Sequence, residues 1–492
     1  MRKHALLTFV VAAGFAASGA SAQVDLTELS ATDAAAKIRS GEITSEALTR
    51  ALIEKAKAGK SLNAFITLDE DGALKAAKAA DAAARAKRFK GPLHGVPIVI
   101  KDNTHVAGLP NTAGTPGLKG FVPKRHAAVV RKLVDAGAVV LGKTNMHELA
   151  FGITSNNGGF GAVGNPYDPK RIAGGSSGGT GAALAARMAP AGLGSDTGGS
   201  VRIPAAVDGI VGLRPTLKRY SQEGITPIAH TRDTAGPMAR SVADLVLLDT
   251  VITGAKDIVK PAALKGLRLG VPKAMYTDID PETARVMDEA LTKLRSAGVE
   301  LIEADVPMLA ELNGKISFPV ALYEVMLDLP AYLKRYNTGM DLKALAGKMA
   351  SPDVSGLFGA LLKGEPPSIA RKVYDEALKT RPKLIAAYAG YFKQHKVAAI
   401  VFPTTPLPAA PIGDDKDTEL NGKKVPTFPT FIRNTDPGSN AGIPGLALPA
   451  GMTKGGLPVG MALDGPAGSD RKLLAIGLAL EKLFPQLPAP KR

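Results

Sequence analysis

Residues 173–202 read AGGSSGGTGAALAARMAPAGLGSDTGGSVR and hold two serine clusters set among glycines. Ser176 and Ser177 form the first cluster, Ser200 stands in the second, and a short alanine-rich helix is expected between them. A serine hydroxyl beside glycine backbone N–H groups supplies both a nucleophile and donors for a developing oxyanion. Tight turns alone need only a positive φ and would not explain why both clusters carry serine. The stretch therefore favours acyl-transfer chemistry.

The sequence on either side alternates between strand and helix patterns. Strands are expected at 96–100, 138–143, 209–213, 267–272, 299–304, 397–403, 444–450 and 458–465. Helices are expected within 27–58, where Thr44 or Ser45 is the candidate N-cap, and at 73–87, 126–137, 241–253, 281–296 and 469–484. Strand, helix and strand joined by short connections predict a largely parallel sheet covered by helices.

The remaining segments indicate one domain. Residues 306–395 have few strand signals and are expected to form a mostly helical cap on the sheet. We find no internal repeat, low-complexity linker or composition shift that would mark a boundary. The apolar fraction of 45% is enough for a large buried core. We therefore expect residues 23–492 to form a single catalytic domain.

The N-terminus has the pattern of a secretory signal peptide. Arg2 and Lys3 precede an apolar run from Ala5 to about Gly19, and Ala20-Ser21-Ala22 resembles a cleavage site. The alternative is an uncleaved membrane anchor, but the run is short for a helix of about 20 residues that spans a bilayer. We expect a signal peptide at 1–22 and an exported, periplasmic protein without stable membrane association after cleavage.

Charge and cysteine content narrow the possible classes. The chain contains no cysteine, so disulfides and thiolate metal sites are excluded. The formal net charge of +16 raises the question of nucleic-acid binding. However, the basic residues are scattered, and the densest groups lack interleaved aromatic residues. We attribute the charge to a solvated surface and expect no nucleic-acid partner.

Three other motifs partly match the serine-containing segments, but each lacks a required feature. Ser176 fits the G-x-S-x-G motif of α/β-hydrolases, but no buried strand precedes it directly, and only His230 and His395 follow it. A phosphate-binding loop would end in Gly-Lys-Ser/Thr, whereas the helix here opens GGTGAAL. Ser469 and Lys472 match S-x-x-K without the companion K-T-G, which favours a capped helix start.

A metal site is also weakly indicated. His147 and Glu148 would have to combine with His126 to bind a metal ion, but the three lack the i, i+4 spacing of helical zinc ligands. We expect no metal and no cofactor.

Lys101, GGSSGG at 174–179 and GSDTGGSVRIPA at 194–205 together closely resemble the amidase signature family. The resemblance covers essentially all of the chain after the signal. It implies an α/β/α sandwich with a large mixed central sheet covered by helices on both faces. Carried over by position, it implies Ser200 as the nucleophile, Ser176 as a bridging serine after a cis peptide bond, and Lys101 as the base.

The resemblance implies further roles around this triad. Its oxyanion hole corresponds to the backbone amides of Thr197, Gly198, Gly199 and Ser200. We expect Asp196 and Arg202 to pair and to hold the nucleophile turn. Ala150 corresponds to a position whose backbone carbonyl orients the substrate nitrogen.

The chemistry of Lys101 can be argued from the residues themselves. A lysine accepts a proton at neutral pH only when its pKa is lowered, and burial beside Val96, Ile98 and Ile100 would disfavour the ammonium form. Ser-Lys catalysis is a known variant of the serine-base theme.

Three segments, at 145–157, 317–324 and 439–449, look most like the indoleacetamide hydrolase and mandelamide hydrolase branch. We therefore expect an amidase that cleaves a small-molecule carboxamide, such as an arylacetamide, to carboxylate and ammonia. Alternatives within the family are an aryl-acylamidase, an esterase, a peptide amidase and an amidotransferase subunit. A binding protein with an inert triad is disfavoured because all three residues are present, and a homodimer is compatible with the family.

Overall fold

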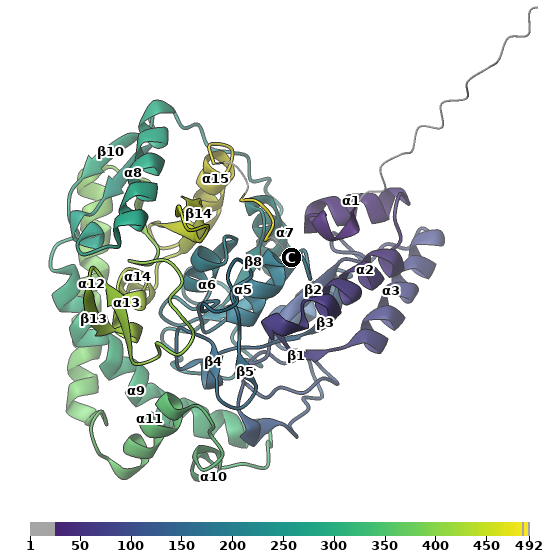
Figure 1. Ribbon diagram of the computed structural model, residues 1–492, viewed down its shortest axis with the longest axis horizontal. Coiled ribbons are helices and arrows are strands. Elements are labelled where there is room, and N and C mark those ends of the chain that lie inside the picture. The colour runs from purple at the N-terminus through teal and green to yellow at the C-terminus, as the bar shows by residue number, and fades with distance from the viewer. Residues whose placement is uncertain (1–24, 485–486, 491–492) are drawn as a thin grey trace, which may run out of the picture.

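The computed structural model describes residues 25–484 and 487–490 (Figure 1). The segment 1–22, where the sequence predicts a signal peptide, lies outside the described residues. Within the described part of the chain, eleven strands form one sheet. Their spatial order is β1 (Phe65–Leu68), β3 (Val139–Thr144), β2 (Pro97–Lys101), β6 (Ala191–Asp196), β8 (Thr234–Ala239), β7 (Val211–Arg214), β14 (Gly445–Met452), β15 (Pro458–Asp464), β11 (Ala399–Pro403), β9 (Arg268–Val271) and β10 (Glu300–Glu303).

The sheet is mixed, so the expectation of a largely parallel sheet from the strand-helix-strand pattern is wrong. Strand β2 pairs in parallel with β3 and β6, and β9 pairs in parallel with β10 and β11. The other neighbouring pairs are antiparallel. Strands β14 and β15 are joined by a tight turn, which permits only an antiparallel pair. The mixed sheet implied by the family resemblance is confirmed.

The described chain also contains fifteen α-helices. They are α1 (Ala31–Ser40), α2 (Ser45–Ala58), α3 (Glu70–Arg85), α4 (Ala128–Asp135), α5 (Gly178–Ala185), α6 (Arg202–Val207), α7 (Val242–Thr253), α8 (Pro281–Ser296), α9 (Leu309–Arg335), α10 (Leu342–Ala346), α11 (Pro352–Lys363), α12 (Arg371–His395), α13 (Thr427–Ile432), α14 (Asp436–Ala441) and α15 (Asp470–Leu480). Two short hairpins lie outside the main sheet: β4 (Asn156–Asn157) with β5 (Gly161–Ala162), and β12 (Asp417–Leu420) with β13 (Lys423–Pro426).

The helical segment expected at 27–58 is divided into α1 and α2. Gly41 ends α1 in the left-handed conformation, with φ +79°, which is a common way to terminate a helix. Thr44 then begins α2, because its side chain accepts a hydrogen bond from the backbone N–H of Ala47. Of the two N-cap candidates, Thr44 is therefore confirmed.

Helices cover both faces of the centre of the sheet. Gly212 of β7 faces α6, because a Cβ there would meet Val201 and Ala205. The next residue, Leu213, points to the opposite face, since side chains alternate along a strand. Leu446, which pairs with Leu213, contacts α15 on that face. Gly192 of β6 and Gly212 both pair with Met238 and so share a face, and a Cβ at Gly192 would lie 3.0 Å from Thr180 of α5. Helices α5 and α6 thus lie on one face, and α15, whose Gly477 lies close to Val242 of α7, lies with α7 on the other.

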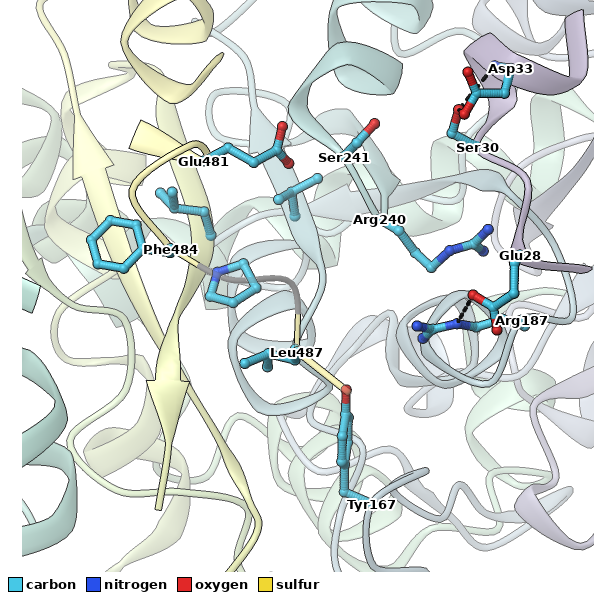
Figure 2. A pocket seen from close by; sticks show the side chains of 14 residues that line it. Glu28, Ser30, Asp33, Tyr167, Arg187, Arg240, Ser241, Glu481, Phe484 and Leu487 are labelled. Atoms are coloured by element: carbon cyan, nitrogen blue, oxygen red, sulfur yellow. Dashed lines mark hydrogen bonds and ion pairs between the residues drawn. The ribbon is translucent and has the colours of Figure 1, made fainter. Parts of the chain in front are cut away.

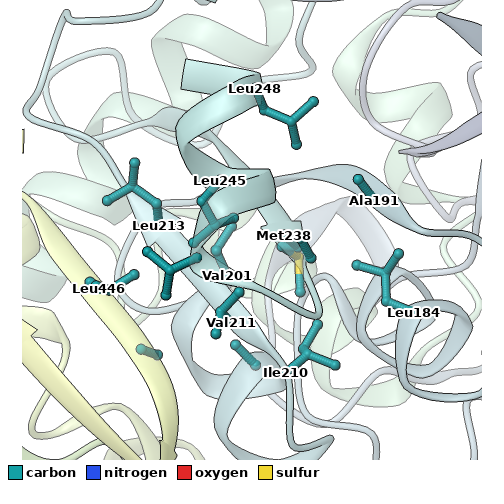
Figure 3. Packing of buried hydrophobic residues seen from close by; sticks show 14 of the residues in the cluster. Leu184, Ala191, Val201, Ile210, Val211, Leu213, Met238, Leu245, Leu248 and Leu446 are labelled. Atoms are coloured by element: carbon teal, nitrogen blue, oxygen red, sulfur yellow. The ribbon is translucent and has the colours of Figure 1, made fainter. Parts of the chain in front are cut away.

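The main hydrophobic core lies between these layers and reaches the serine-containing turns (Figure 3). Val201, which follows Ser200, is fully buried. Its side chain lies so close to the sheet that a Cβ at Gly212 or Gly236 would come within 2.9 Å of it. Packing of this density is typical of protein interiors and resists displacement. The turn that carries Ser200 is therefore anchored to the sheet by the residue next to it.

Four helices, α9 to α12, fill the region between 309 and 395. Buried side chains of α9 and α12 pack together against Ile400 and Phe402 of β11. Helix α9 is long and apolar enough to cross a membrane by length and composition alone. However, its residues Ile316 and Val320 are fully buried in this cluster, so this part of α9 belongs to the protein core.

Candidate active site

The two serine clusters lie beside each other in space. Ser176 and Ser177 precede α5, and Ser200 stands in the turn between β6 and α6. The backbone N–H of Ser177 donates to the carbonyl of Ser200 over 3.2 Å. The peptide bond between Gly175 and Ser176 is cis. The structure therefore brings both clusters together at one end of β6.

Lys101 reaches this place from the neighbouring strand. It is the last residue of β2, which pairs directly with β6, and its side chain is fully buried. Its Nζ lies 2.7 Å from Ser176 Oγ. Burial lowers the pKa of Lys101 to about 7, and the negative charges of Asp196 and Asp233 only partly oppose this shift. A substantial fraction of the amine is therefore neutral at neutral pH.

Two neighbours of Lys101 were not identified from the sequence. Its Nζ also lies 2.9 Å from Ser195 Oγ and 3.5 Å from the Ser195 carbonyl oxygen. Asn103 donates through Nδ2 to the same Ser195 hydroxyl over 2.9 Å. Ser195 lies in the quoted stretch, five residues before Ser200, and Asn103 lies two residues after Lys101. Both were thus within the motifs, but only the strand pairing shows that they converge.

The turn from Thr197 to Ser200 presents free backbone donors. Among the hydrogen bonds of the described residues, none is donated by the backbone N–H of Gly198, Gly199 or Ser200. Thr435 holds the turn from behind, since its Oγ1 donates to the Gly198 carbonyl over 2.8 Å. A Cβ on Gly199 would lie 2.2 Å from that Oγ1, so only glycine fits there. The turn can offer several N–H groups to one oxygen atom.

Asp196 and Arg202 lie directly beneath this turn and form a buried ion pair. Arg202 Nε lies 3.2 Å from Asp196 Oδ2, and the backbone N–H of Val201 donates to the same oxygen. A second arginine, Arg214 of β7, approaches Asp196 Oδ1 to 3.0 Å. Burial raises the pKa of Asp196, but the two guanidinium groups outweigh it and hold the pKa below its usual value. Arg214 was not identified from the sequence.

Asp233 supports the turn from its other side. Its carboxylate accepts a 2.7 Å hydrogen bond from Thr197 Oγ1 and further bonds from the backbone N–H groups of Ile228 and Ala229. Burial raises the pKa of Asp233 to about 6, although these three donors act against the shift. Asp233 was not identified from the sequence, because the residue lies outside every recognisable motif.

Ala150 lies on a loop that is bonded to the Ser176 loop. Its backbone is left-handed, with φ +64°, and its N–H donates to the carbonyl of His147. The N–H of His147 in turn donates to the Ser176 carbonyl over 3.1 Å. Ala150 thus belongs to the same group of loops as the serines.

The three residues considered for a metal site are engaged elsewhere. His147 Nε2 lies 2.9 Å from Asp353 Oδ2, Glu148 accepts the backbone N–H of Ser351, and His126 Nδ1 accepts the N–H of Ala107. Glu148 and His147 therefore connect this loop to the start of α11.

Among the described residues, one other group has a spacing that a cation would fit. It consists of His230, Glu324 and Asp328. The Glu324 carboxylate already accepts hydrogen bonds from Thr231 and Tyr374, and Asp328 pairs with His230. The group is thus accounted for by hydrogen bonding within the protein.

The histidines of the α/β-hydrolase alternative and the serine of the S-x-x-K alternative have other contacts. His230 is exposed and pairs with Asp328, and His395 packs against Tyr391 at the end of α12. Ser469 is the N-cap residue of α15, so the helix start expected there is confirmed, but its side chain makes no capping hydrogen bond. Neither histidine has a hydrogen bond to Ser176 in the described structure, and an α/β-hydrolase arrangement is not formed.

A cavity of about 360 Å³ borders Asp233 and is also lined by Asp328, Tyr332 and Tyr336. A second, of about 260 Å³, is lined by Glu28, Arg187 and Arg240 together with Glu481 and Phe484, which follow α15 (Figure 2). Arg240 donates there to the backbone carbonyls of the segment before α1. That role is structural, because these bonds tie the start of the described chain to the sheet.

Residues 47–474 match the model of the Amidase family, which is most of the chain. The chain is 45% identical over 437 residues to an indoleacetamide hydrolase of Agrobacterium vitis, covering 88% of this chain and 92% of that protein. It is 43% identical over 485 residues to a mandelamide hydrolase of Pseudomonas putida, covering 95% of this chain and 94% of that one.

A solved structure gives the same result for the fold. The native peptide amidase of Stenotrophomonas maltophilia superimposes with a TM-score of 0.78 at 30% identity, covering 94% of this chain and 98% of the other. The chain therefore belongs to the amidase signature family. It is an amidase, an enzyme that hydrolyses the C–N bond of an amide.

Proposed function

We propose that this amidase hydrolyses a small-molecule primary carboxamide of the arylacetamide type to a carboxylate and ammonia, through an acyl-Ser200 intermediate. The observation that carries the proposal is the buried Nζ of Lys101, 2.7 Å from Ser176 Oγ beside the Ser200 turn. The similarity to an indoleacetamide hydrolase and a mandelamide hydrolase supports the substrate class.

The cycle begins with proton transfer. Neutral Lys101 accepts the hydroxyl proton of Ser176, and Ser176 accepts that of Ser200 as Ser200 Oγ attacks the amide carbon. A pKa of about 7 for Lys101 suits this role, because an efficient general base titrates near the working pH.

The negative charge that develops on the carbonyl oxygen is stabilised by the turn from Thr197 to Ser200. Asp233 and Thr435 hold the turn in place through Thr197 and Gly198. The free backbone N–H groups of the turn therefore need little rearrangement during the reaction. One such donor is typically worth about 3–4 kcal/mol. The carbonyl of Ala150 is assigned the role of orienting the substrate nitrogen.

The tetrahedral intermediate then breaks its C–N bond. Ser176 donates a proton to the leaving nitrogen, ammonia departs, and Ser176 recovers its proton from the Lys101 ammonium. Water next attacks the acyl carbon while the same relay accepts its proton. The C–O bond to Ser200 breaks and Ser200 regains the relayed proton. The carboxylic acid that leaves releases its remaining proton to water and becomes the carboxylate.

The direct test is ammonia release from purified protein across a panel of aryl and aliphatic amides. Turnover of phenylacetamide, with loss of activity in Ser200→Ala and Lys101→Ala, is the expected result. Preferential cleavage of C-terminal peptide amides, anilides or esters would instead assign one of the alternative substrate classes. No turnover of any of these would overturn the proposal.

We also propose that the protein is exported to the periplasm after cleavage at Ala22. The basic and apolar pattern of residues 1–22 supports this proposal. N-terminal sequencing of the protein from a periplasmic extract should begin at Gln23. Recovery only from the cytoplasm with Met1 intact would contradict it. The same preparation, analysed by light scattering, would test for a homodimer.

A further inference from the structure

Partly exposed apolar side chains surround the catalytic loops from two sides. Helix α13 supplies Phe428 and Ile432, and helix α9 supplies Phe318 and Ala321. We call these four residues the apolar rim. The α9 pair and the α13 pair lie more than a hundred positions apart along the chain, so only the fold brings the two pairs together.

The α13 side of the rim touches the oxyanion turn. A Cβ on Gly198 would lie 2.7 Å from Ile432 Cδ1, so the Ile432 side chain lies directly against that turn. Phe428 precedes Ile432 by four residues on the same helix, a spacing that puts both side chains on one face. Phe428 therefore extends the apolar surface outward from the turn.

The α9 side continues this surface to the Ala150 loop. The Phe318 and Phe428 rings are 5.9 Å apart and inclined at 49°, a geometry typical of attractive ring pairs. Ala321 follows Phe318 by three residues and packs against the cluster that contains Ala150. The rim thus links the oxyanion turn at Gly198 to the cluster that contains Ala150.

Phe318 is a large apolar side chain that is exposed to solvent. It is 48% exposed, and its ring lies against Phe428, on the helix whose Ile432 contacts the oxyanion turn. Exposed apolar area beside a catalytic centre is a common property of substrate-binding surfaces. A flat ring on the substrate would cover it and gain edge or stacking contacts with both phenylalanines.

We propose that Phe318 and Phe428 bind the aromatic ring of the acyl group and thereby select arylacetamides over short aliphatic amides. This inference rests on the proposed function and names the side chains that determine its substrate class. Neither residue touches the reacting atoms, so both act on specificity and not on the chemical step.

The test compares kcat/KM for phenylacetamide and propionamide in Phe318→Ala, Phe428→Ala and the double variant. Each single change should lower kcat/KM for phenylacetamide about tenfold, as expected when one good ring contact is lost. Hydrolysis of propionamide should stay within about twofold, since it does not reach the rim. Retained propionamide activity also verifies that each variant is folded.

Leu327→Ala is the matched control. Leu327 lies on the same helix, is 51% exposed, and is nine residues from Phe318, which places it on the opposite face. This variant should match wild type on both amides. Equal losses on both amides in the phenylalanine variants, or no loss on either, would overturn the inference. A wild-type protein that hydrolyses neither amide would instead contradict the proposed function itself.

Discussion

Lys101 Nζ lies 2.9 Å from Ser195 Oγ, and this contact determines how the lysine can act. A neutral amine has two N–H groups and one lone pair. The Ser195 carbonyl can only accept a hydrogen bond, and the Ser195 hydroxyl already accepts one from Asn103. A hydroxyl oxygen has two lone pairs, so the Ser195 hydroxyl can accept an N–H of Lys101 as well as that of Asn103. With both of its N–H groups directed to Ser195, the amine keeps its lone pair for the hydroxyl proton of Ser176.

Replacing Ser195 should therefore impair the base without changing substrate binding. We expect Ser195→Ala to lower kcat by about 100-fold with little change in KM, the low end of the roughly 100- to 10,000-fold that general-base catalysis contributes, because Lys101 itself is retained. Its pH profile should move to lower pH, because a lost acceptor destabilises the Lys101 ammonium. Ser195→Thr keeps the hydroxyl and should restore most activity. A profile identical to wild type in Ser195→Ala would show that the contact has no role in the relay.

The pH dependence of the wild-type enzyme follows from the lowered pKa of Lys101. Because only the neutral amine accepts a proton, kcat/KM should rise with pH through about 7 and level off above it. Steady-state kinetics between pH 5.5 and 9 would measure this limb. A rate that is flat across pH 6–8 would exclude Lys101 as the titrating base.

The ion pairs beneath the oxyanion turn should be important for stability. Arg214→Met would remove one of two guanidinium groups that face the buried Asp196 carboxylate. Breaking a buried ion pair from one side typically costs about 3–5 kcal/mol. Urea denaturation should show a loss of this size. A free energy of unfolding within about 1 kcal/mol of wild type would mean that Arg202 alone suffices.

Asp208 offers a stabilising change. It is fully buried at the end of α6, and neither carboxylate oxygen has a hydrogen-bond partner in the described structure. Burial raises its pKa well above the usual value. Above about pH 4, the ordinary pKa of an aspartate, the unfolded chain releases this proton while the folded protein retains it. The free energy of unfolding therefore falls as the pH rises above that value.

Asp208→Asn carries no charge at any pH and avoids this loss. We expect its free energy of unfolding to exceed that of wild type by about 1–3 kcal/mol at pH 8, and the difference to shrink toward pH 4.5. Chemical denaturation at the two pH values measures both. A variant less stable than wild type at pH 8 would contradict this account of the buried carboxyl.

Much of the fold could be predicted from local patterns, but two adjacent strands next to the centre of the sheet could not. The expected helix at 281–296 agrees with α8 at both ends, whereas β6 and β8 were missed. These strands contain small residues, glycine and proline, which have low strand propensity. Tertiary packing explains them: a Cβ at Gly236 of β8 would lie 2.5 Å from the Leu213 carbonyl oxygen.

Some residues of the candidate site could likewise be predicted from the sequence, and others could not. Lys101, Ser176 and Ser200 stand in recognisable motifs, so residue type and spacing were sufficient to select them. Arg214 and Asp233 each reach the site from a separate segment with no motif. Their contribution depends on strand pairing across β6, β8 and β7, which local sequence does not determine.

The central claim is that Ser200, and not Ser176, forms the acyl-enzyme. The most direct measurement is mass-spectrometric mapping of a fluorophosphonate adduct on the wild-type enzyme. We predict a single adduct on Ser200, and no labelling or amide turnover in Ser200→Ala. An adduct on Ser176, or labelling and turnover that persist in Ser200→Ala, would contradict the account.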